Sequence, residues 1–344
     1  MDHLSIHPVS GVSQFEATRG DLVGLFQRCG HPWSVTAHPD WVSHWWRSRA
    51  SSPRLVCCLI HDHDALVAAV PLEFSKLPVM TWTSTNLHWG WSSALVHPTA
   101  GERWMRTYAQ WLGDGAGPWA SVQMGLLPID GPASRQLRAF EGPGHKRFWV
   151  RDLASLDLTD GFDAFLDRQS KNLRRKIRRT EKAATENGLS PKVRVQPAPD
   201  YLHTVVGAVS SRSWQGTTGR AVYSDPSNRE FYRLLTRDPG DLQLVLNHVE
   251  APDGLPIAYV LGVRVADVVH HIDTGFDPEF ADYSPGLLAT LDAVRWATEQ
   301  GLATVDLGID ADYKARFTRD VQRAEGLEIT QGAVGFVKRL RPPR

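Results

Sequence analysis

Residues 241–316 show the clearest order of apolar and polar positions in the chain. Three runs rich in β-branched residues come first, and turn residues such as Asp253-Gly254 separate them, so each run predicts a strand. A segment with apolar residues at helical spacing follows and stops at Gly301. The pattern predicts strands at 242–249, 257–265 and 268–276, a helix at 286–300, a strand at 304–309 and a short helix at 313–318.

The first half of the chain shows a similar order of elements. Helical spacing occurs at 21–28, 39–49 and 102–112, strand-like runs at 54–61, 64–75, 79–96 and 120–127, and a short helical run at 132–140. The second half opens with a strand at 192–196 and a helix at 201–213. This repetition predicts an α/β (α+β) protein made of two tandem mixed-sheet units rather than a solenoid, whose repeats are shorter. The predicted division is 1–150, a basic connecting helix at 151–190, and 191–344.

The most basic segment of the chain lies between the two halves. Residues 160–187 predict one long helix that Gly188 closes, and seven Lys and Arg residues fall within the twelve positions 171–182. Like charges at neighbouring helical positions repel one another unless an anion is near. The segment is therefore either a solvated helix face or a binding site for phosphate.

Composition excludes several classes of protein. Lys plus Arg equals Asp plus Glu at 38 each, which argues against a DNA-binding protein. The longest apolar runs are too short to span a bilayer, and the segment after Met1 lacks the features of a signal peptide, so a cytoplasmic location is expected. Three cysteines, of which Cys57 and Cys58 are adjacent, form neither a disulfide framework nor a zinc motif. No metal is predicted.

Tryptophan is abundant and unevenly distributed. Ten of the 13 tryptophans lie between Trp33 and Trp119. Around Trp89 and Trp91 they mix with small polar residues, which fits either an aromatic core or a groove for a flat substrate. Trp214 likewise fits either the wall of a substrate site or a core anchor at a helix end.

Four local motifs carry a resemblance to a known family. They are SKNLRRKIRR at 170–179, Ser213-Trp214, YSPGLL at 283–288, and DLG at 306–308 followed by YKARF at 313–317. Together they span about 160–317. In this order the motifs resemble the GNAT superfamily, specifically tandem proteins similar to the CelD-like acetyltransferases of bacterial cellulose biosynthesis. More distantly the chain resembles the Fem aminoacyl transferases.

The resemblance implies a biosynthetic acyltransferase. An acyl group would pass from acetyl-CoA or another acyl-CoA to an amine or hydroxyl of a small-molecule acceptor, in a cleft between the two units. Backbone amides at the helix start, at Ser284, Gly286 and Leu287, would bind the pyrophosphate, with Arg175 and Arg179 as further phosphate ligands. This loop departs from the usual GNAT pattern, because it has one glycine and no Arg or Gln in register.

Five residues are candidates for catalysis. Strand alternation places His271 and Asp273 on one face, where the carboxylate would orient the imidazole as a base. Asp306 lies in an apolar strand, so it needs either a raised pKa or a cationic partner, and Lys314 is the nearest candidate. The GNAT resemblance implies Tyr313 as the acid that protonates the leaving thiolate. The Fem resemblance implies Lys314 as a stabiliser of charge.

Two alternatives stay open at this stage. A Fem-like enzyme would use aminoacyl-tRNA as its donor, and the basic helix would attract the RNA. A degenerate GNAT pair would serve as a binding module without catalysis. The sequence does not identify the acceptor or the oligomeric state.

Overall fold

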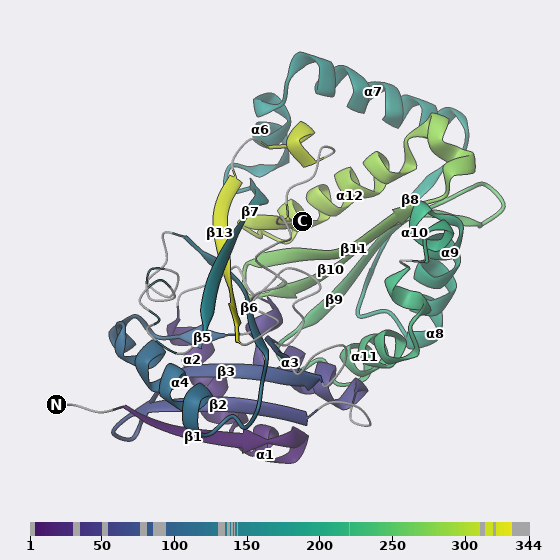
Figure 1. Cartoon of the computed structure of the whole chain (residues 1–344). Helices are drawn as coiled ribbons and strands as arrows, with labels where there is room; N and C mark the ends of the chain where they lie inside the picture. The colour runs from purple at the N-terminus through teal and green to yellow at the C-terminus, as the bar shows by residue number, and fades with distance from the viewer. Residues whose placement is uncertain are drawn as a thin grey trace. The chain divides into compact units, whose positions relative to one another are not determined.

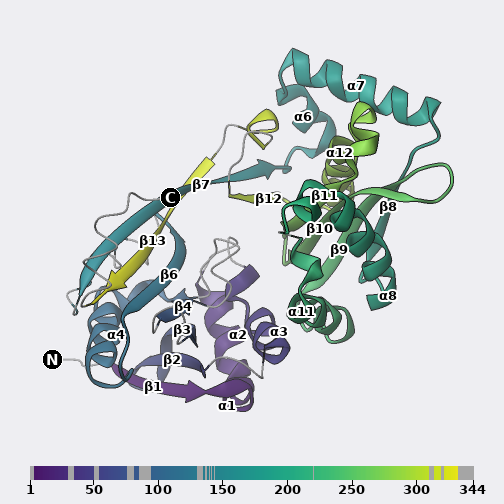
Figure 2. The ribbon, with the colours of Figure 1, turned by 45° about the vertical axis from the view of Figure 1, so that its right-hand side comes forward.

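The computed structural model describes most of the chain. The described residues are 4–29, 35–49, 54–75, 81–84, 94–129, 135, 138, 140, 142, 144–219, 221–309, 314–318 and 321–331. The chain divides into two compact units, one formed by Met1–Asp152 with the residues from Gln322 onward and the other by Leu153–Val321. Figures 1 and 2 show the elements of both units.

This division differs from the boundaries expected from the sequence. The basic segment belongs to the second unit rather than forming a separate connector, because Leu173 and Ile177 are buried in one cluster with Leu291 and Val294. The chain also returns to the first unit after Val321, where its last strand pairs with an earlier one. Apolar burial and strand pairing thus set the boundaries.

The first unit contains a mixed sheet in the order β1-β2-β3-β4-β6-β13, and β5 pairs with β3. Strands β4 and β6 are parallel, and the other neighbours in this order are antiparallel. Its strands are β1 (Ser5–Ser10), β2 (Arg54–Asp62), β3 (Ala65–Ser75), β4 (Thr81–Ser84), β5 (Leu95–Val96), β6 (Ser121–Pro128) and β13 (Val321–Thr330). Its helices are α1 (Gly11–Ala17), α2 (Arg19–Arg28), α3 (Pro39–Ser48) and α4 (Arg103–Asp114), with 3₁₀ turns at Val35–Ala37 and Pro98–Ala100.

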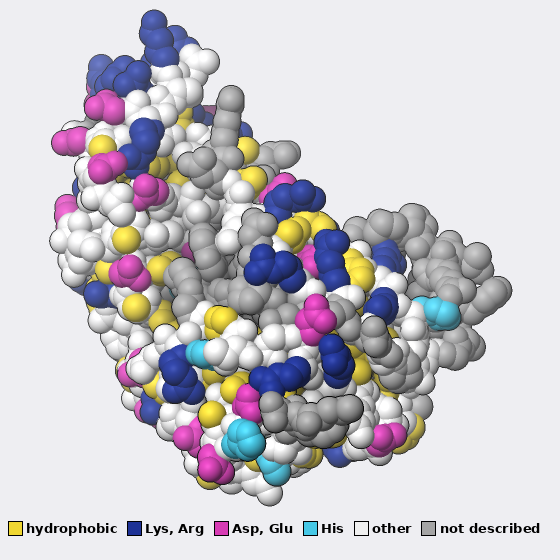
Figure 3. Space-filling model, turned by 90° about the vertical axis from the view of Figure 1, so that its left-hand side faces the viewer, with side chains coloured by type: hydrophobic (Ala, Val, Ile, Leu, Met, Phe, Trp, Pro, Cys, Tyr) yellow, Lys and Arg dark blue, Asp and Glu magenta, His cyan; other side chains and the backbone are white. Residues whose placement is uncertain are grey.

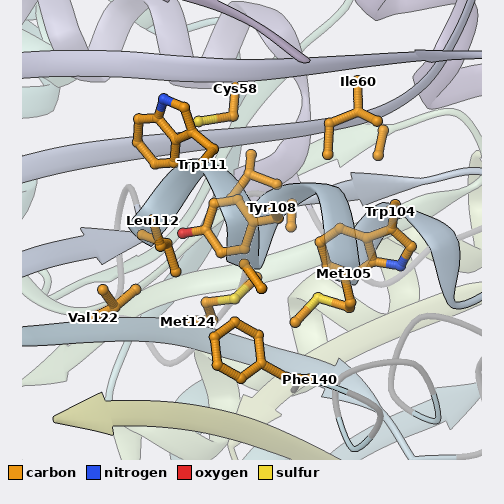
Figure 4. Packing of buried hydrophobic residues seen from close by; sticks show 14 of the residues in the cluster. Cys58, Ile60, Trp104, Met105, Tyr108, Trp111, Leu112, Val122, Met124 and Phe140 are labelled. Carbon is orange, nitrogen blue, oxygen red and sulfur yellow. The ribbon is translucent and has the colours of Figure 1, made fainter. Parts of the chain in front are cut away.

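Aromatic side chains of α4 fill the core of the first unit. Trp104, Tyr108 and Trp111 lie on one face of this helix, and all three are buried against the sheet (Figure 4). Cys57 and Cys58 are buried in β2, and burial raises the pKa of both thiols. Both cysteines are free and pack within the strand.

The second unit contains a mixed sheet in the order β7-β12-β11-β10-β9-β8. Strands β11 and β12 are parallel, and the neighbours on either side are antiparallel. The strands are β7 (His145–Asp157), β8 (Ser190–Val195), β9 (Gln243–Glu250), β10 (Pro256–Val265), β11 (Val268–Phe276) and β12 (Thr304–Ile309). The chain passes from the first unit to the second within β7. The expected bounds of β11 and β12 agree with the structure, and the prediction of mixed sheets is confirmed.

Helices cover both faces of this sheet (Figure 2). On one face lie α6 (Gly161–Arg168), α7 (Lys171–Glu186) and α12 (Pro285–Glu299). On the other lie α8 (Pro199–Leu202), a π-helical turn at His203–Gly207, α9 (Ala208–Arg212), α10 (Trp214–Thr217), a 3₁₀ turn at Val222–Ser224 and α11 (Pro226–Arg237). Two further 3₁₀ turns occur at Pro278–Tyr283 and Lys314–Arg316, the latter being η7.

Two predicted helices differ in detail. The long helix at 160–187 is broken into α6 and α7, because Gln169 and Ser170 are extended and the Ser170 hydroxyl accepts a hydrogen bond from the Leu173 amide at 3.2 Å, which caps α7. The predicted helix at 313–318 is a single 3₁₀ turn in its described part. Most of the helix predicted at 132–140 and most of the strand-rich run at 79–96 lie outside the described residues.

Helix length and hydropathy also test for membrane spans. Across the described part of the chain, no helix combines the length and the apolar content needed to cross a bilayer.

Candidate active site

The candidate site lies where two parallel strands of the second unit separate. The β11–β12 ladder pairs Val268–His270 with Thr304–Asp306 and does not extend further. A cavity of about 190 Å³, here called the active pocket, occupies this position. Its lining comes from β10, β11, β12, α10, α12 and η7, and comprises Gln215, Val260, His271, Ile272, Asp273, Thr274, Thr290, Leu307, Lys314 and Phe317.

A β-bulge lies in the part of β11 that lines the pocket. Leu261 faces Asp273 and Gly262 faces His271, so Ile272 is the extra residue of β11. A Cβ at position 262 would lie only 2.9 Å from Val269 Cγ1, so a larger residue there would force the Val269 side chain to shift. Four consecutive residues around the bulge, His271 to Thr274, line the pocket.

Asp273 is the most extensively hydrogen-bonded group of the pocket. Its Oδ2 accepts from the Tyr259 hydroxyl at 2.9 Å, and its Oδ1 accepts from Gln215 Nε2 at 3.2 Å and from the Thr274 amide at 2.9 Å. Burial raises the pKa of Asp273 from 3.8 to about 6, although these hydrogen bonds oppose the shift. A carboxyl group with this pKa exchanges protons near neutral pH.

His271 lies in the same pocket and is neutral at pH 7. Burial of the ring lowers its pKa to about 3, and the positive charge of Lys314 adds to the effect. The residue keeps some surface exposure, yet its Nε2 atom is buried and has no hydrogen-bond partner among the described residues. The expected orientation of His271 by Asp273 is not observed, because that carboxylate bonds to Tyr259, Gln215 and a backbone amide instead.

The histidine–carboxylate pair of this site involves the preceding histidine. His270 Nδ1 lies 2.8 Å from Asp306 Oδ2, and both side chains are buried. The other oxygen of Asp306 accepts from the Gly308 amide at 2.8 Å, in a bulge where Gly308 has a φ of +76°. The partner that Asp306 requires is therefore His270 and not Lys314.

Lys314 has a different environment from the one expected. Its ammonium donates to the carbonyl oxygen of Ile309 at 2.6 Å and to that of Leu307, both on β12. These carbonyls hold the positive charge beside the active pocket, which Lys314 lines.

The residues predicted to bind the donor, Ser284, Gly286 and Leu287, lie at the start of α12, and their binding role stays a prediction. Ser284 precedes α12 in a left-handed conformation, with Pro285 in the first helical turn, and no side chain caps the helix. The Cβ of any residue replacing Gly286 would lie 3.4 Å from the Phe276 ring, so the residue stands close to the end of β11. Leu287 packs partly buried on the second unit's core.

Three further predicted residues that the structure describes, Arg175, Arg179 and Trp214, lie outside the pocket lining. Arg175 and Arg179 are exposed on α7. Trp214 is 56% exposed, so it is not the core anchor that was one of its two interpretations, and its neighbour Gln215 lines the pocket. Tyr313, Trp89 and Trp91 lie outside the described residues, and their roles stay predictions.

Sequence reasoning missed Tyr259, Gln215 and the pairing role of His270. In the sequence Tyr259 is indistinguishable from an ordinary residue of an apolar strand. Its ring lies against the backbone of Gly275, where a Cβ would be 2.8 Å from Tyr259 Cε1. A glycine in each of two paired strands, Gly262 in β10 and Gly275 in β11, together with the consecutive histidines of β11, was the available signal for an irregular, functional strand.

Part of the second unit matches a known family. Residues 171–315 match the family model of the acetyltransferase (GNAT) domain, and they lie within the second unit. Solved structures extend the fold likeness to nearly the whole chain. A tandem GNAT protein from the clavulanic acid biosynthesis pathway is 13% identical with a TM-score of 0.56, and covers 96% of this chain and 99% of its own.

Two further structures share the fold. FemX is 12% identical with a TM-score of 0.62, covering 91% of this chain and 96% of its own. The C-terminal domain of a putative lysylphosphatidylglycerol synthetase from Agrobacterium fabrum is 12% identical with a TM-score of 0.57, covering 94% and 95%. These likenesses confirm the predicted tandem GNAT fold. The closer CelD-like relationship stays a prediction.

Curated relatives match a shorter stretch. An aspartate/glutamate leucyltransferase from Stenotrophomonas maltophilia (strain K279a) is 33% identical over 103 residues, which is 27% of this chain and 41% of that protein. The same enzyme from strain R551-3 is 32% identical over 103 residues. The chain thus spans about two fifths of the length of these relatives, 41%.

Proposed function

We propose that the chain is an acyltransferase whose reaction takes place in the active pocket of the second unit. The observation that carries this proposal is Asp273, a buried carboxyl group with a pKa of about 6 in a pocket of a GNAT domain. Such a group is ionised at neutral pH and can accept the proton of an attacking amine or hydroxyl.

The reaction follows from the chemistry of the lining. The acceptor nucleophile attacks the acyl carbonyl carbon while Asp273 takes its proton. The tetrahedral intermediate carries a negative oxygen, which the ammonium group of Lys314 stabilises electrostatically. The intermediate then collapses, the bond to the donor breaks, and the leaving group takes a proton. The role of Tyr313 as the source of this proton rests on the family resemblance alone.

His271 fits a supporting role better than the role of base. An imidazole with a pKa of about 3 is a weak proton acceptor, but it remains neutral in the presence of Lys314. Its unpartnered Nε2 can hydrogen-bond to a substrate group within the pocket. We therefore assign proton transfer to Asp273 and positioning to His271.

Acyl-CoA is the donor that the GNAT domain supports first. The start of α12 offers backbone amides and the positive end of the helix dipole, and Thr290 of the same helix lines the active pocket. Coenzyme A bound at Ser284, Gly286 and Leu287 would bring its thioester toward this pocket.

Aminoacyl-tRNA is a second candidate donor, because the curated relatives are named leucyltransferases. Helix α7 provides a cationic surface that suits RNA phosphates. Its exposed cations are Lys171, Arg175, Lys176, Arg178, Arg179 and Lys182. Binding through these charges would weaken steeply with salt.

A donor and acceptor screen tests the proposal. Purified protein is incubated with acetyl-CoA, longer acyl-CoAs or charged tRNA together with an amine and alcohol library, and products are followed by released thiol and by mass. Acceptor-dependent acyl transfer that Asp273→Asn abolishes is the expected result. Ribonuclease sensitivity assigns the donor to RNA. Failure of every donor to give product or to shift the melting temperature would instead favour a binding module without catalysis.

A further inference from the structure

A second, larger cavity of the second unit adjoins the active pocket. It has a volume of about 800 Å³, within the range of small-molecule sites, and lies between α6, the start of α7 and η7. Phe317 lines both cavities, and the residues of η7 divide between them: Lys314 lines the active pocket, whereas Ala315 and Arg316 line the larger cavity. The two cavities are therefore neighbours across one turn of chain.

The floor of the larger cavity is apolar. Leu156, Phe165, Leu173 and Phe317 all line it, and each is less than 8% exposed. Such a floor favours a ligand with an apolar body, because each apolar group that leaves water for this surface gains free energy.

The rim of the cavity is cationic. Lys176 and Arg316 are exposed on different elements, and neither has an ion-pair partner among the residues that the structure describes. Arg168 also lies on the rim, where it pairs with Asp160 at 3.0 Å. Figure 3 shows Lys and Arg side chains gathered over the end of the molecule that carries α6 and α7.

Polar groups at the start of α7 add to this preference for negative charge. Ser170 and Asn172 line the cavity beside the first turn of a 16-residue helix, whose dipole is positive at this end. The carboxylate of Asp157 also lines the cavity, and its Oδ1 accepts hydrogen bonds from the Thr159 amide at 3.0 Å and from the Thr159 hydroxyl at 2.7 Å. These hydrogen bonds lower the pKa of Asp157.

From this arrangement we propose that the acceptor of the reaction is an amphipathic anion. Its apolar body lies on the floor of the larger cavity, its negative group is bound by Lys176 and Arg316, and its nucleophile reaches past Phe317 into the active pocket. This inference rests on the proposed acyl transfer for the role of acceptor. The preference for an apolar anion rests on the cavity itself.

The ligand of the larger cavity is assigned as the acceptor rather than the donor because different elements of the active pocket lead to the two sites. Thr290 lines the active pocket and belongs to α12, whose start is the proposed donor site. Phe317 lines both the active pocket and the larger cavity. Donor and acceptor would therefore approach the reacting carbon from different elements.

A matched pair of dyes tests this inference without turnover. The probe is 8-anilinonaphthalene-1-sulfonate, and the comparison is N-phenyl-1-naphthylamine, which has the same aromatic body without the sulfonate. Fluorescence titration is expected to show at least about tenfold tighter binding of the sulfonate, since one charge-assisted contact supplies that difference. The double variant Lys176→Gln/Arg316→Gln should remove the preference. The matched control Lys182→Gln, which removes an exposed cation of α7 outside the cavity, should keep it.

Three outcomes would overturn the inference. They are equal binding of the two dyes, an unchanged preference in the double variant, and displacement of the sulfonate by coenzyme A that depends on Arg316, which would assign the cavity to the donor. Because no step of this assay needs catalysis, charge-selective binding stands even where the acyl-transfer screen fails. If the screen detects acyl transfer but the larger cavity binds both dyes equally, the proposed function stands and the inference about the acceptor does not.

Discussion

The two units fill their interiors in different ways. In the first unit α4 packs Trp104, Tyr108 and Trp111 against the sheet. In the second unit Asp273 and His271 line a cavity of about 190 Å³ beside β11. Aromatic packing gains free energy from buried area, whereas buried carboxyl and imidazole groups cost free energy and are tolerated for their chemistry. The contrast predicts that substitutions in the first interior affect stability, and those in the second affect activity.

The largest expected effect is on activity in the second unit. Asp273→Asn keeps the shape of the side chain and a hydrogen bond to the Tyr259 hydroxyl, but it cannot accept a proton. We expect kcat/KM to fall by about 10²–10⁴, the usual contribution of a general base. The assay is thiol release with the acceptor found by screening. Glu299→Gln, which changes an exposed carboxylate at the end of α12, serves as the control and should leave activity unchanged. An Asp273→Asn enzyme with wild-type kcat/KM would refute the assignment of the base.

The next effect is on stability in the first unit. Trp104→Ala removes a fully buried indole and leaves a cavity, so we expect the free energy of unfolding to fall by about 3–5 kcal/mol. Urea unfolding measures this loss. Arg106→Ala on the exposed face of the same helix should change it by less than about 0.5 kcal/mol, because its ion pair with Glu102 is solvent-exposed. Similar losses for both variants would contradict the aromatic packing of this unit.

A smaller effect is the contribution of Asp273 to the pH dependence of the free energy of unfolding. Its pKa is about 6 in the folded protein, whereas the same carboxyl group exposed to water has a pKa of 3.8. Between these values the folded chain keeps a proton that the unfolded chain releases, so this group stabilises folding below pH 3.8 and that stabilisation is lost as the pH rises through 6. The loss amounts to about 1–3 kcal/mol.

Comparison with Asp273→Asn isolates this contribution. The variant lacks the titration, so its stability relative to the native sequence should increase between about pH 4 and pH 7 when both are unfolded by urea. Over the same range the activity of the native sequence should rise with an apparent pKa near 6. A stability difference that does not depend on pH would show that Asp273 is not buried as an acid.

The smallest expected effect is on stability and concerns a buried tyrosine hydroxyl in the first unit. The Tyr108 hydroxyl is buried without a hydrogen-bond partner among the described residues, and burial raises its pKa well above 10. Tyr108→Phe removes a polar atom that gains nothing from burial, so we expect unchanged or slightly higher stability, within about 1 kcal/mol. Thermal unfolding measures this. A clear loss would mean that the first interior also holds a required polar group.

Much of the second unit was predictable from local pattern. The bounds of β11 and β12 agree with those expected from β-branched residues and turn signals. The helix after Pro285 was predicted from its apolar spacing and from Gly301. The two-unit architecture followed from the repeated order of elements, and the motifs near α7 and α12 indicated the GNAT class.

The contents of the active pocket were predictable only in part. His271 and Asp273 were predicted from strand alternation, and Lys314 from its nearness in sequence to Asp306 and from the Fem resemblance. All three line the pocket. The partner of Asp306 was wrongly expected to be Lys314, because nearness in sequence was used in place of nearness across the sheet. The parallel ladder instead places His270 directly beside Asp306.

The amino-acid sequence by itself determined the elements, their order and the class of protein, because hydrophobic periodicity and turn residues act over a few positions. Only the tertiary structure decided which side chains meet. The bulge at Ile272 and the end of the β11–β12 ladder depend on strands that are distant in sequence. Burial then sets the pKa values of Asp273 and His271, since desolvation arises from the whole packed environment and not from neighbouring residues in the chain.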